Sequence, residues 1–208
     1  MRAILVLGAG GHGKVVADAL RAAGRMPAGF LDADPDVKAP LDLPVLGTDE
    51  HLSSLDPNEF ELANGVGSTD ACERRRTVFE NARRLGFGFV TVIHPRAVVS
   101  PAAHFAEGVQ IMAGAIVQAG AVVGENALIN TGALIDHDCD IGPHCHIATG
   151  ARLSGTVKLG RECHIGAGAT MIQGTGLGAG CLVGAGAVVI RSFGDSVRLV
   201  GVPARELR

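Results

Sequence analysis

Large apolar residues recur at every sixth position through the second half of the chain. From Val99 onward, sixteen consecutive positions at this spacing hold no polar residue. An α-helix would bring apolar residues to one face every three or four positions, and a flat strand every two. The six-residue period therefore predicts short strands joined by corners, in a repeat architecture. The positions are Val99, Phe105, Ile111, Val117, Val123, Ile129, Ile135, Ile141, Ile147, Leu153, Leu159, Ile165, Met171, Leu177, Val183 and Val189.

The residues that flank each repeated position fit the same architecture. Two positions earlier the chain mostly carries Ala or Cys, whose small side chains let neighbouring walls close. The position directly after is often Gly, Asn or Asp, as at Gly124 and Asn130, so we expect the strained φ of each corner there. Free Cys packs as a small hydrophobe, and we favour this role over a disulfide or a zinc site because the register points the thiols inward. The cysteines in this register are Cys139, Cys145, Cys163 and Cys181.

The start of the chain has a different pattern, which predicts a small α/β unit. Residues 2–7, with the apolar run 3–7, predict a buried parallel strand; a glycine-rich turn occupies residues 8–13, and an amphipathic stretch covers residues 14–23. Glycines between a strand and a helix let a phosphate approach the amides at the helix start. Asp32 follows a second apolar run, where a ribose-binding acid stands in mononucleotide-binding units. A tight structural turn without ligand is the alternative.

The main alternative function for this unit is that of a dinucleotide-dependent oxidoreductase. Only about ninety residues precede the repeat, which leaves room for one mononucleotide half instead of the usual pair. A further strand and turn at residues 63–67 and a charged helix over residues 70–84 complete the unit. We therefore expect a nucleotide-binding domain over residues 1–92 and a repeat domain over residues 93–208. His94 precedes Pro95 and is interpreted as structural.

Composition and charge exclude several classes of partner. The chain has 208 residues, a formal net charge of -3, 30 glycines and neither Trp nor Tyr. Without a block of Lys and Arg, binding to nucleic acid or to an anionic membrane is not expected. The first apolar run is too short for a signal peptide or a membrane span, so we expect a cytoplasmic protein. The glycine content fits a repeat that needs many permissive backbone positions.

Several motifs together resemble one enzyme family over essentially the whole chain. They are Gly-Ala-Gly-Gly-His-Gly at residues 8–13, Phe-Leu-Asp-Ala-Asp at 30–34, Ile-His-Pro at 93–95, Asn-Thr-Gly at 130–132, Asp-His-Asp-Cys at 136–139 and Gly-Val-Pro-Ala at 201–204. This combination resembles the hexapeptide-repeat acyltransferases that O-acetylate sialic acid or N-acetylate nucleotide-linked 4-amino sugars. Within that family it is most similar to GDP-perosamine-type N-acetyltransferases.

The resemblance carries expectations for fold, cosubstrate and assembly. It implies a Rossmann-like mononucleotide unit followed by a left-handed parallel β-helix in which three hexads, about 18 residues, complete one coil. Residues 99–194 would then form about five coils. It also implies acetyl-CoA as cosubstrate, no metal, a homotrimer with acetyl-CoA sites between subunits, and a nucleotide-sugar acceptor from glycan biosynthesis.

One hexad carries a candidate base. Ile135 and Cys139 point inward in the predicted register, which leaves His137 and Asp138 outside. A carboxylate beside an imidazole raises the pKa of the imidazole and improves it as a base. One coil of 18 residues separates His137 from Gly155, so we expect bare backbone against the histidine. The same spacing puts His146 and His164 in one row.

The family resemblance assigns roles to these and other residues. It makes His137 the general base and Asp138 its support, and it brings His146 and the Gly155 amide near the acetyl carbonyl. Some relatives carry Glu at the position of Asp138, so the shorter arm leaves the direct contact open. The remaining assignments are main-chain CoA contacts at Ala167 and Ala185, and nucleotide-sugar contacts at Gly10, Gly11, His12, Asp32 and Asp34.

The sequence leaves several residue roles and functions undecided. We expect His144 and His164 to be exposed, with His146 the main exception among the remaining β-helix histidines, and His12 could instead bond its own turn. No residue separates an amine from a hydroxyl acceptor. A zinc enzyme with the same repeat would need about three convergent imidazoles, whose pattern this chain lacks. A non-catalytic nucleotide-sugar-binding protein is the last alternative.

Overall fold

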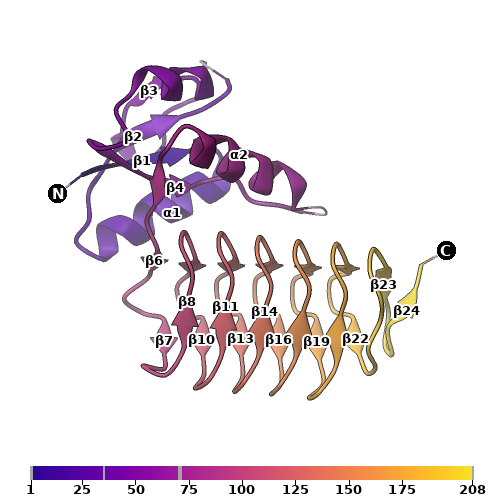
Figure 1. Ribbon diagram of the computed structural model, residues 1–208. Coiled ribbons are helices and arrows are strands. Elements are labelled where there is room, and N and C mark those ends of the chain that lie inside the picture. The colour runs from indigo at the N-terminus through magenta and orange to yellow at the C-terminus, as the bar shows by residue number, and fades with distance from the viewer. Residues whose placement is uncertain (1, 35, 70–71, 208) are drawn as a thin grey trace.

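A computed structural model describes residues 2–34, 36–69 and 72–207. A small α/β unit lies against one side of a long stack of coils, and the C-terminus lies at the far end of that stack (Figure 1). Across the described residues, no helix is both long and apolar enough to cross a membrane.

The α/β unit is a parallel five-stranded sheet with helices beside it, here called sheet A. The strand expected over residues 2–7 is present, and Asp32 follows the second strand as predicted. In order across the sheet the strands are β3 (Val45–Gly47), β2 (Pro27–Leu31), β1 (Ala3–Leu7), β4 (Phe60–Asn64) and β5 (Gly88–Phe89). The helices are α1 (Gly11–Ala22) and α2 (Glu73–Arg84), with short 3-10 helices η1 (Pro40–Asp42) and η2 (Asp49–Ser54).

Helix α1 begins earlier than the sequence predicts. Helix α1 starts at Gly11, not Lys14, because the glycine turn runs directly into the first helical turn, where the Lys14 amide donates to Gly10 O. Helix α2 starts at Glu73; the predicted start at Asp70 lies outside the described residues.

The second part is a parallel β-helix with three walls. Wall B contains β6 (Val92–Ile93), β9 (Gln110–Ile111), β12 (Leu128–Ile129), β15 (His146–Ile147), β18 (His164–Ile165), β21 (Leu182–Val183), β23 (Arg198–Val200) and the antiparallel β24 (Arg205–Glu206). Wall C contains β7 (Val98–Val99), β10 (Ile116–Val117), β13 (Leu134–Ile135), β16 (Arg152–Leu153), β19 (Thr170–Met171) and β22 (Val188–Val189). Wall D contains β8 (His104–Phe105), β11 (Val122–Val123), β14 (Asp140–Ile141), β17 (Lys158–Leu159) and β20 (Gly176–Leu177).

The β-helix extends beyond the predicted residues 99–194 at both ends. The chain leaves sheet A after Phe89 and joins wall B at Val92, and β23 and β24 extend the same wall beyond the last hexad.

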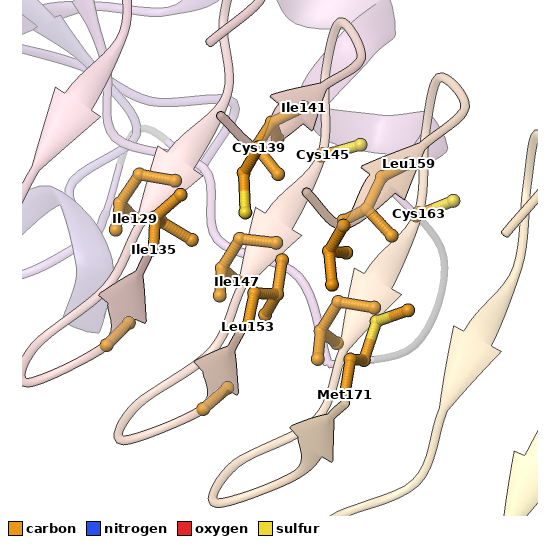
Figure 2. Close-up of a cluster of buried hydrophobic side chains, with 14 of the residues drawn as sticks. Ile129, Ile135, Cys139, Ile141, Cys145, Ile147, Leu153, Leu159, Cys163 and Met171 are labelled. Carbon is orange, nitrogen blue, oxygen red and sulfur yellow. The ribbon is translucent and has the colours of Figure 1, made fainter. Parts of the chain in front are cut away.

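The repeated apolar residues fill the interior of the coils. Ile135 pairs with Val117 on one side and Leu153 on the other, a spacing of one coil. Figure 2 shows such side chains stacked from coil to coil. The four cysteines of the repeat are buried free thiols in the same core, as the register predicts. Burying a ladder of aliphatic side chains is the main stabilising contribution to this fold.

The predicted position of the corners was wrong by two residues. Positive φ occurs at the third position after fourteen of the sixteen repeated apolar residues, for example Asn126 (54°) and Asp138 (57°), and not at the first. The glycines at the first position have another cause. A Cβ at Gly142 would lie 2.6 Å from the Gly160 carbonyl carbon of the next coil. Close approach of neighbouring coils, not backbone strain, therefore explains these glycines.

Candidate active site

A pocket of about 550 Å³ lies where the glycine turn after β1 faces wall B. We call it the glycine-turn pocket. It brings together residues from both parts of the chain, so neither part forms it alone. Its lining residues are Gly8, Gly10, Gly11, His12, Asp32, Gly65, Val66, Gly67, Ser68, Thr69, Arg74, Asn130 and His146.

The glycines of the turn divide into packed and open positions. Gly8 has φ 94°, and a Cβ at Gly13 would collide with the Gly8 carbonyl oxygen. A Cβ at Gly10 or Gly11 would have no heavy atom within 4 Å. Gly8 and Gly13 are therefore needed for the turn itself, whereas Gly10 and Gly11 keep the start of α1 open. The N-cap residue of α1 is Gly10, which has no side chain to cap the helix, and uncapped amides at a helix start attract an anion such as phosphate.

The predicted acids differ in position. Asp32 lines the pocket, and its carboxylate accepts the Ala9 amide at 2.6 Å and the Asp34 amide at 2.9 Å. Asp34 is exposed and accepts the Asp36 amide at 3.0 Å, which closes a local turn. Asp34 is not among the residues that line the glycine-turn pocket. The structure thus groups Asp32, but not Asp34, with the other predicted nucleotide-sugar residues.

His12 bonds across the two parts of the chain and not to its own turn. Its Nε2 lies 2.9 Å from Gln110 Oε1 on β9. Burial, and then the charge of Arg75, lower the pKa of His12 to about 4. The alternative that His12 instead bonds its own turn is therefore wrong.

A second pocket of about 370 Å³ continues along wall B, and we call it the coil pocket. Ala167 and Ala185, the predicted CoA contacts, both line it. They follow strands β18 and β21 at the same corner of successive coils. Four residues line both pockets, so the two form one continuous surface; they are Ser68, Thr69, Asn130 and His146.

His146 links the two pockets and has a defined tautomer. The Thr131 amide donates to Asn130 Oδ1, which turns the Asn130 amide nitrogen toward His146 Nε2 at 3.0 Å. Because that nitrogen only donates, Nε2 accepts and Nδ1 carries the proton. His146 Nδ1 then donates to Ser68 Oγ at 2.7 Å. Burial, the neighbouring His164 and Arg75 lower the pKa of His146 to about 2, so the ring is neutral.

The expectation that the other β-helix histidines are exposed was wrong. His144, His146 and His164 are only 2%, 4% and 5% exposed. The outward side of wall B lies under the α/β unit, whose residue Phe79 on α2 packs edge-on against His144. For His146 and His164 the signal was available in the sequence, because their outward row of wall B, taken every 18 residues from Val92 to Leu182, contains no charged residue. His144 lies outside this row.

His137 and Asp138 form a dyad on the outside of the coils. His137 Nδ1 lies 2.9 Å from Asp138 Oδ2. The direct contact therefore exists with the shorter Asp arm, and Asp tolerates the positive φ of this corner better than most residues. The hydrogen bond to Asp138, together with the charges of Asp136 and Asp138, raises the pKa of His137. A Cβ at Gly155 would collide with Nε2 of His137, so the predicted contact with bare backbone is present.

The dyad and the two pockets lie apart in one chain. His137 and Asp138 are in the corner between walls C and D, between β13 and β14. In a three-walled coil this corner is opposite wall B, where both pockets lie. Neither pocket includes His137 among its lining residues. A reaction that uses both the dyad and the two pockets would therefore require the pockets of another subunit.

Sequence reasoning missed several pocket residues. Ser68 and Thr69 come from the segment between β4 and α2, Arg74 lies in the first turn of α2, and none of the three has a motif of its own. Gln110 was not predicted either. It is a polar residue in the outward row of wall B, where no residue is charged, and this position could have indicated it. Among the described residues, no group of three or more His, Cys, Asp or Glu side chains could hold a metal ion.

Comparison with family models identifies both parts. Residues 3–82 match the PglD N-terminal domain, and residues 120–155 match the bacterial transferase hexapeptide repeat. The acetyltransferase domain of PglB from Neisseria gonorrhoeae is 42% identical, with 100% of each chain covered and a TM-score of 0.94. The chain belongs to this family of hexapeptide-repeat sugar acetyltransferases. Its members have the left-handed parallel β-helix, which confirms the expected fold class.

Two further solved structures of relatives contain ligands. The same Neisseria domain was solved with acetyl-CoA, at 42% identity, 99% coverage of each chain and a TM-score of 0.93. PerB from Caulobacter crescentus was solved with CoA and GDP-perosamine, at 41% identity, 100% coverage of this chain, 98% of that chain and a TM-score of 0.93. Comparison with curated protein sequences found no match.

Proposed function

We propose that this protein transfers the acetyl group of acetyl-CoA to the C4 amine of a nucleotide-linked 4-amino-6-deoxy sugar. The main support is the full-length similarity to PerB, whose complex contains CoA and GDP-perosamine. The acetyl-CoA complex of the Neisseria domain supports the cosubstrate. In this proposal residues 1–92 bind the nucleotide-sugar, residues 93–208 carry the acetyl transfer, and the enzyme works in the cytoplasm.

His137 acts as general base in the proposed mechanism. Its Nδ1–H donates to Asp138 Oδ2, which leaves the lone pair on Nε2, the atom that lies against Gly155. Nε2 takes a proton from the amine as the nitrogen attacks the thioester carbonyl. The tetrahedral intermediate then releases the CoA sulfur, which receives the proton from His137. The Gly155 amide and His146 lie near the acetyl carbonyl in this scheme.

The substrates occupy the two pockets in the proposed complex. The diphosphate of the nucleotide-sugar binds at the open start of α1, beside Gly10 and Gly11, with Asp32 toward the ribose or base. Acetyl-CoA binds along the coil pocket against the backbone of Ala167 and Ala185. Asn130 and His146, which line both pockets, lie where the acetyl group and the amine meet.

A homotrimer completes the proposed site. The base is opposite wall B in its own chain, so a neighbouring subunit has to bring its pockets to His137. The first outward residues of wall C are Val98, Ile116 and Leu134, and Val98 is 63% exposed. An apolar row of this kind on an uncovered wall is suited to burial against a second copy.

The direct test is an acetyl-transfer assay with purified protein. Acetyl-CoA is incubated with UDP-, GDP- and dTDP-linked 4-amino-6-deoxy sugars while release of the free thiol is followed. We expect turnover with one of these acceptors, and loss of turnover in His137→Ala. Turnover only with a hydroxyl sugar such as sialic acid would replace the N-acetyltransferase by an O-acetyltransferase. Nucleotide-sugar binding without any turnover would replace it by a binding protein.

A further inference from the structure

A buried arginine in α2 organises the polar contacts between the two parts of the chain. Arg75 is fully buried, and burial lowers its pKa to about 10, so it stays charged at neutral pH. Its guanidinium donates to the carbonyl oxygens of Asn126 at 3.1 Å and Val66 at 2.8 Å. It also donates to Gln110 Oε1 at 3.1 Å. A buried charge with this many acceptors holds its neighbours in one arrangement.

These contacts fix which way the Gln110 amide points. Gln110 Nε2 donates to the carbonyl oxygen of Asn64 at 2.7 Å, and Gln110 Oε1 accepts from Arg75. A carbonyl oxygen only accepts and a guanidinium only donates, so the opposite orientation would put two donors together and two acceptors together. Gln110 Oε1 is therefore the atom that faces His12 Nε2, 2.9 Å away.

The orientation of Gln110 decides the tautomer of His12. Because Gln110 Oε1 can only accept, His12 Nε2 has to carry the hydrogen. Burial and the charge of Arg75 keep the ring neutral at pH 7. A neutral imidazole with a proton on Nε2 has its free lone pair on Nδ1. His12 is partly buried and lines the glycine-turn pocket.

We propose that Arg75 and Gln110 are positioning residues that make His12 a neutral hydrogen-bond acceptor, whose Nδ1 receives a hydroxyl donor of the bound nucleotide-sugar. This inference rests on the proposed function. It gives His12 a role different from that of a cationic partner for the diphosphate. The negative charge is left to the amides at the start of α1, and His12 selects for a correctly placed hydroxyl group. The hydroxyl belongs either to the ribose or to the hexose.

Two substitutions at His12 separate this role from a purely structural one. In His12→Asn the amide oxygen can stand where Nδ1 was, whereas the bond to Gln110 is lost. In His12→Gln the amide nitrogen can keep the bond to Gln110, whereas the acceptor at Nδ1 is lost. Loss of one hydrogen bond to the ligand corresponds to about a tenfold weaker affinity. We expect His12→Gln to raise the Kd of the nucleotide-sugar about tenfold and His12→Asn to raise it by less than about threefold.

The affinities are measured by calorimetry with GDP and with a GDP-linked 4-amino sugar. If His12→Gln weakens the binding of both ligands, the hydroxyl donor belongs to the ribose. If it weakens the binding of the sugar nucleotide alone, the donor belongs to the hexose. Wild-type affinity in His12→Gln, or weaker binding in His12→Asn than in His12→Gln, would overturn the proposal.

A second measurement does not depend on turnover or on the acceptor. Nitrogen NMR of protein labelled at histidine reports which ring nitrogen carries the proton, and the His12→Asn sample assigns the signal. We expect a neutral ring protonated at Nε2 in the wild-type protein. Gln110→Met removes the fixed acceptor and should release this preference. A proton on Nδ1, or a doubly protonated ring at pH 7, would overturn the proposal even if the acetyltransferase activity is confirmed.

Discussion

At the scale of single residues, Asp138 should set the pH range in which His137, the proposed base, can accept a proton. A base works only in its deprotonated form, and the hydrogen bond to Asp138 raises the pKa of His137. The acid limb of kcat/KM should therefore lie above the pH typical of a free histidine. Asp138→Asn removes this cause, so the limb should move to lower pH while the maximal rate falls. The pH profiles of Asp138→Asn and of the exposed control Asp18→Asn decide this, and an unmoved limb in Asp138→Asn would contradict it.

Gly155 gives a second prediction at this scale, because its missing side chain leaves room for His137. Its φ lies outside the positive range, so Ala at this position does not strain the backbone. The new Cβ would displace the His137 ring, and kcat should fall at least about tenfold with little change in melting temperature. Gly194 is the matched control, since a Cβ there would have no heavy atom within 4 Å. Equal activity of Gly155→Ala and Gly194→Ala would show that the close packing has no part in the reaction.

At the scale of elements, the glycine turn before α1 combines stability and binding in neighbouring positions. Gly13→Ala forces a Cβ into the Gly8 carbonyl oxygen and should destabilise the protein by about 2 kcal/mol. Gly11→Ala has open space and adds a better helix former, so stability should be kept. Its methyl group narrows the pocket, and the KM for the nucleotide-sugar should rise. Gly13→Ala should thus lower the melting temperature more than Gly11→Ala does, whereas Gly11→Ala should raise the KM more than Gly13→Ala does. The same ranking of the two variants in both measurements would contradict the division of the turn into packed and open glycines.

The elements of the fold differ in how far the sequence could predict them. The six-residue period fixes the register of each wall, because every repeated position has to fill the same interior. The corners were predicted two residues early, since a glycine required by close approach to the next coil resembles one required by positive φ. Gly142, with its close approach, and Gly132, with φ 67°, illustrate the two causes. Only the three-dimensional structure distinguishes the two causes, because the neighbour of Gly142 lies 18 residues away in the sequence.

At the scale of the whole molecule, the residues that the sequence could not identify are those that depend on how the two parts meet. Gln110 is an outward residue of an ordinary coil until the α/β unit covers wall B. Arg75 has the sequence context of a solvated helix, yet it is fully buried. The six-residue period alone carries no information about which wall is covered; only the lack of charged residues in the outward row of wall B indicates it. The His137 and Gly155 pair, in contrast, could be predicted because both belong to the same repeat.

The separation of base and pockets yields a prediction about subunit exchange. One inactive chain carries His137→Ala; the other carries Gly11→Leu, which fills the glycine-turn pocket. If the proposed homotrimer forms, random mixing of equal amounts puts both chains into three quarters of the trimers. Each mixed trimer then has one site that combines an intact base with an intact pocket. Co-refolded mixtures should therefore recover about a quarter of the wild-type activity, although each chain alone is inactive. No recovery in mixtures that contain mixed trimers would mean that base and pocket act within one chain, which the opposite positions of wall B and the corner between walls C and D argue against.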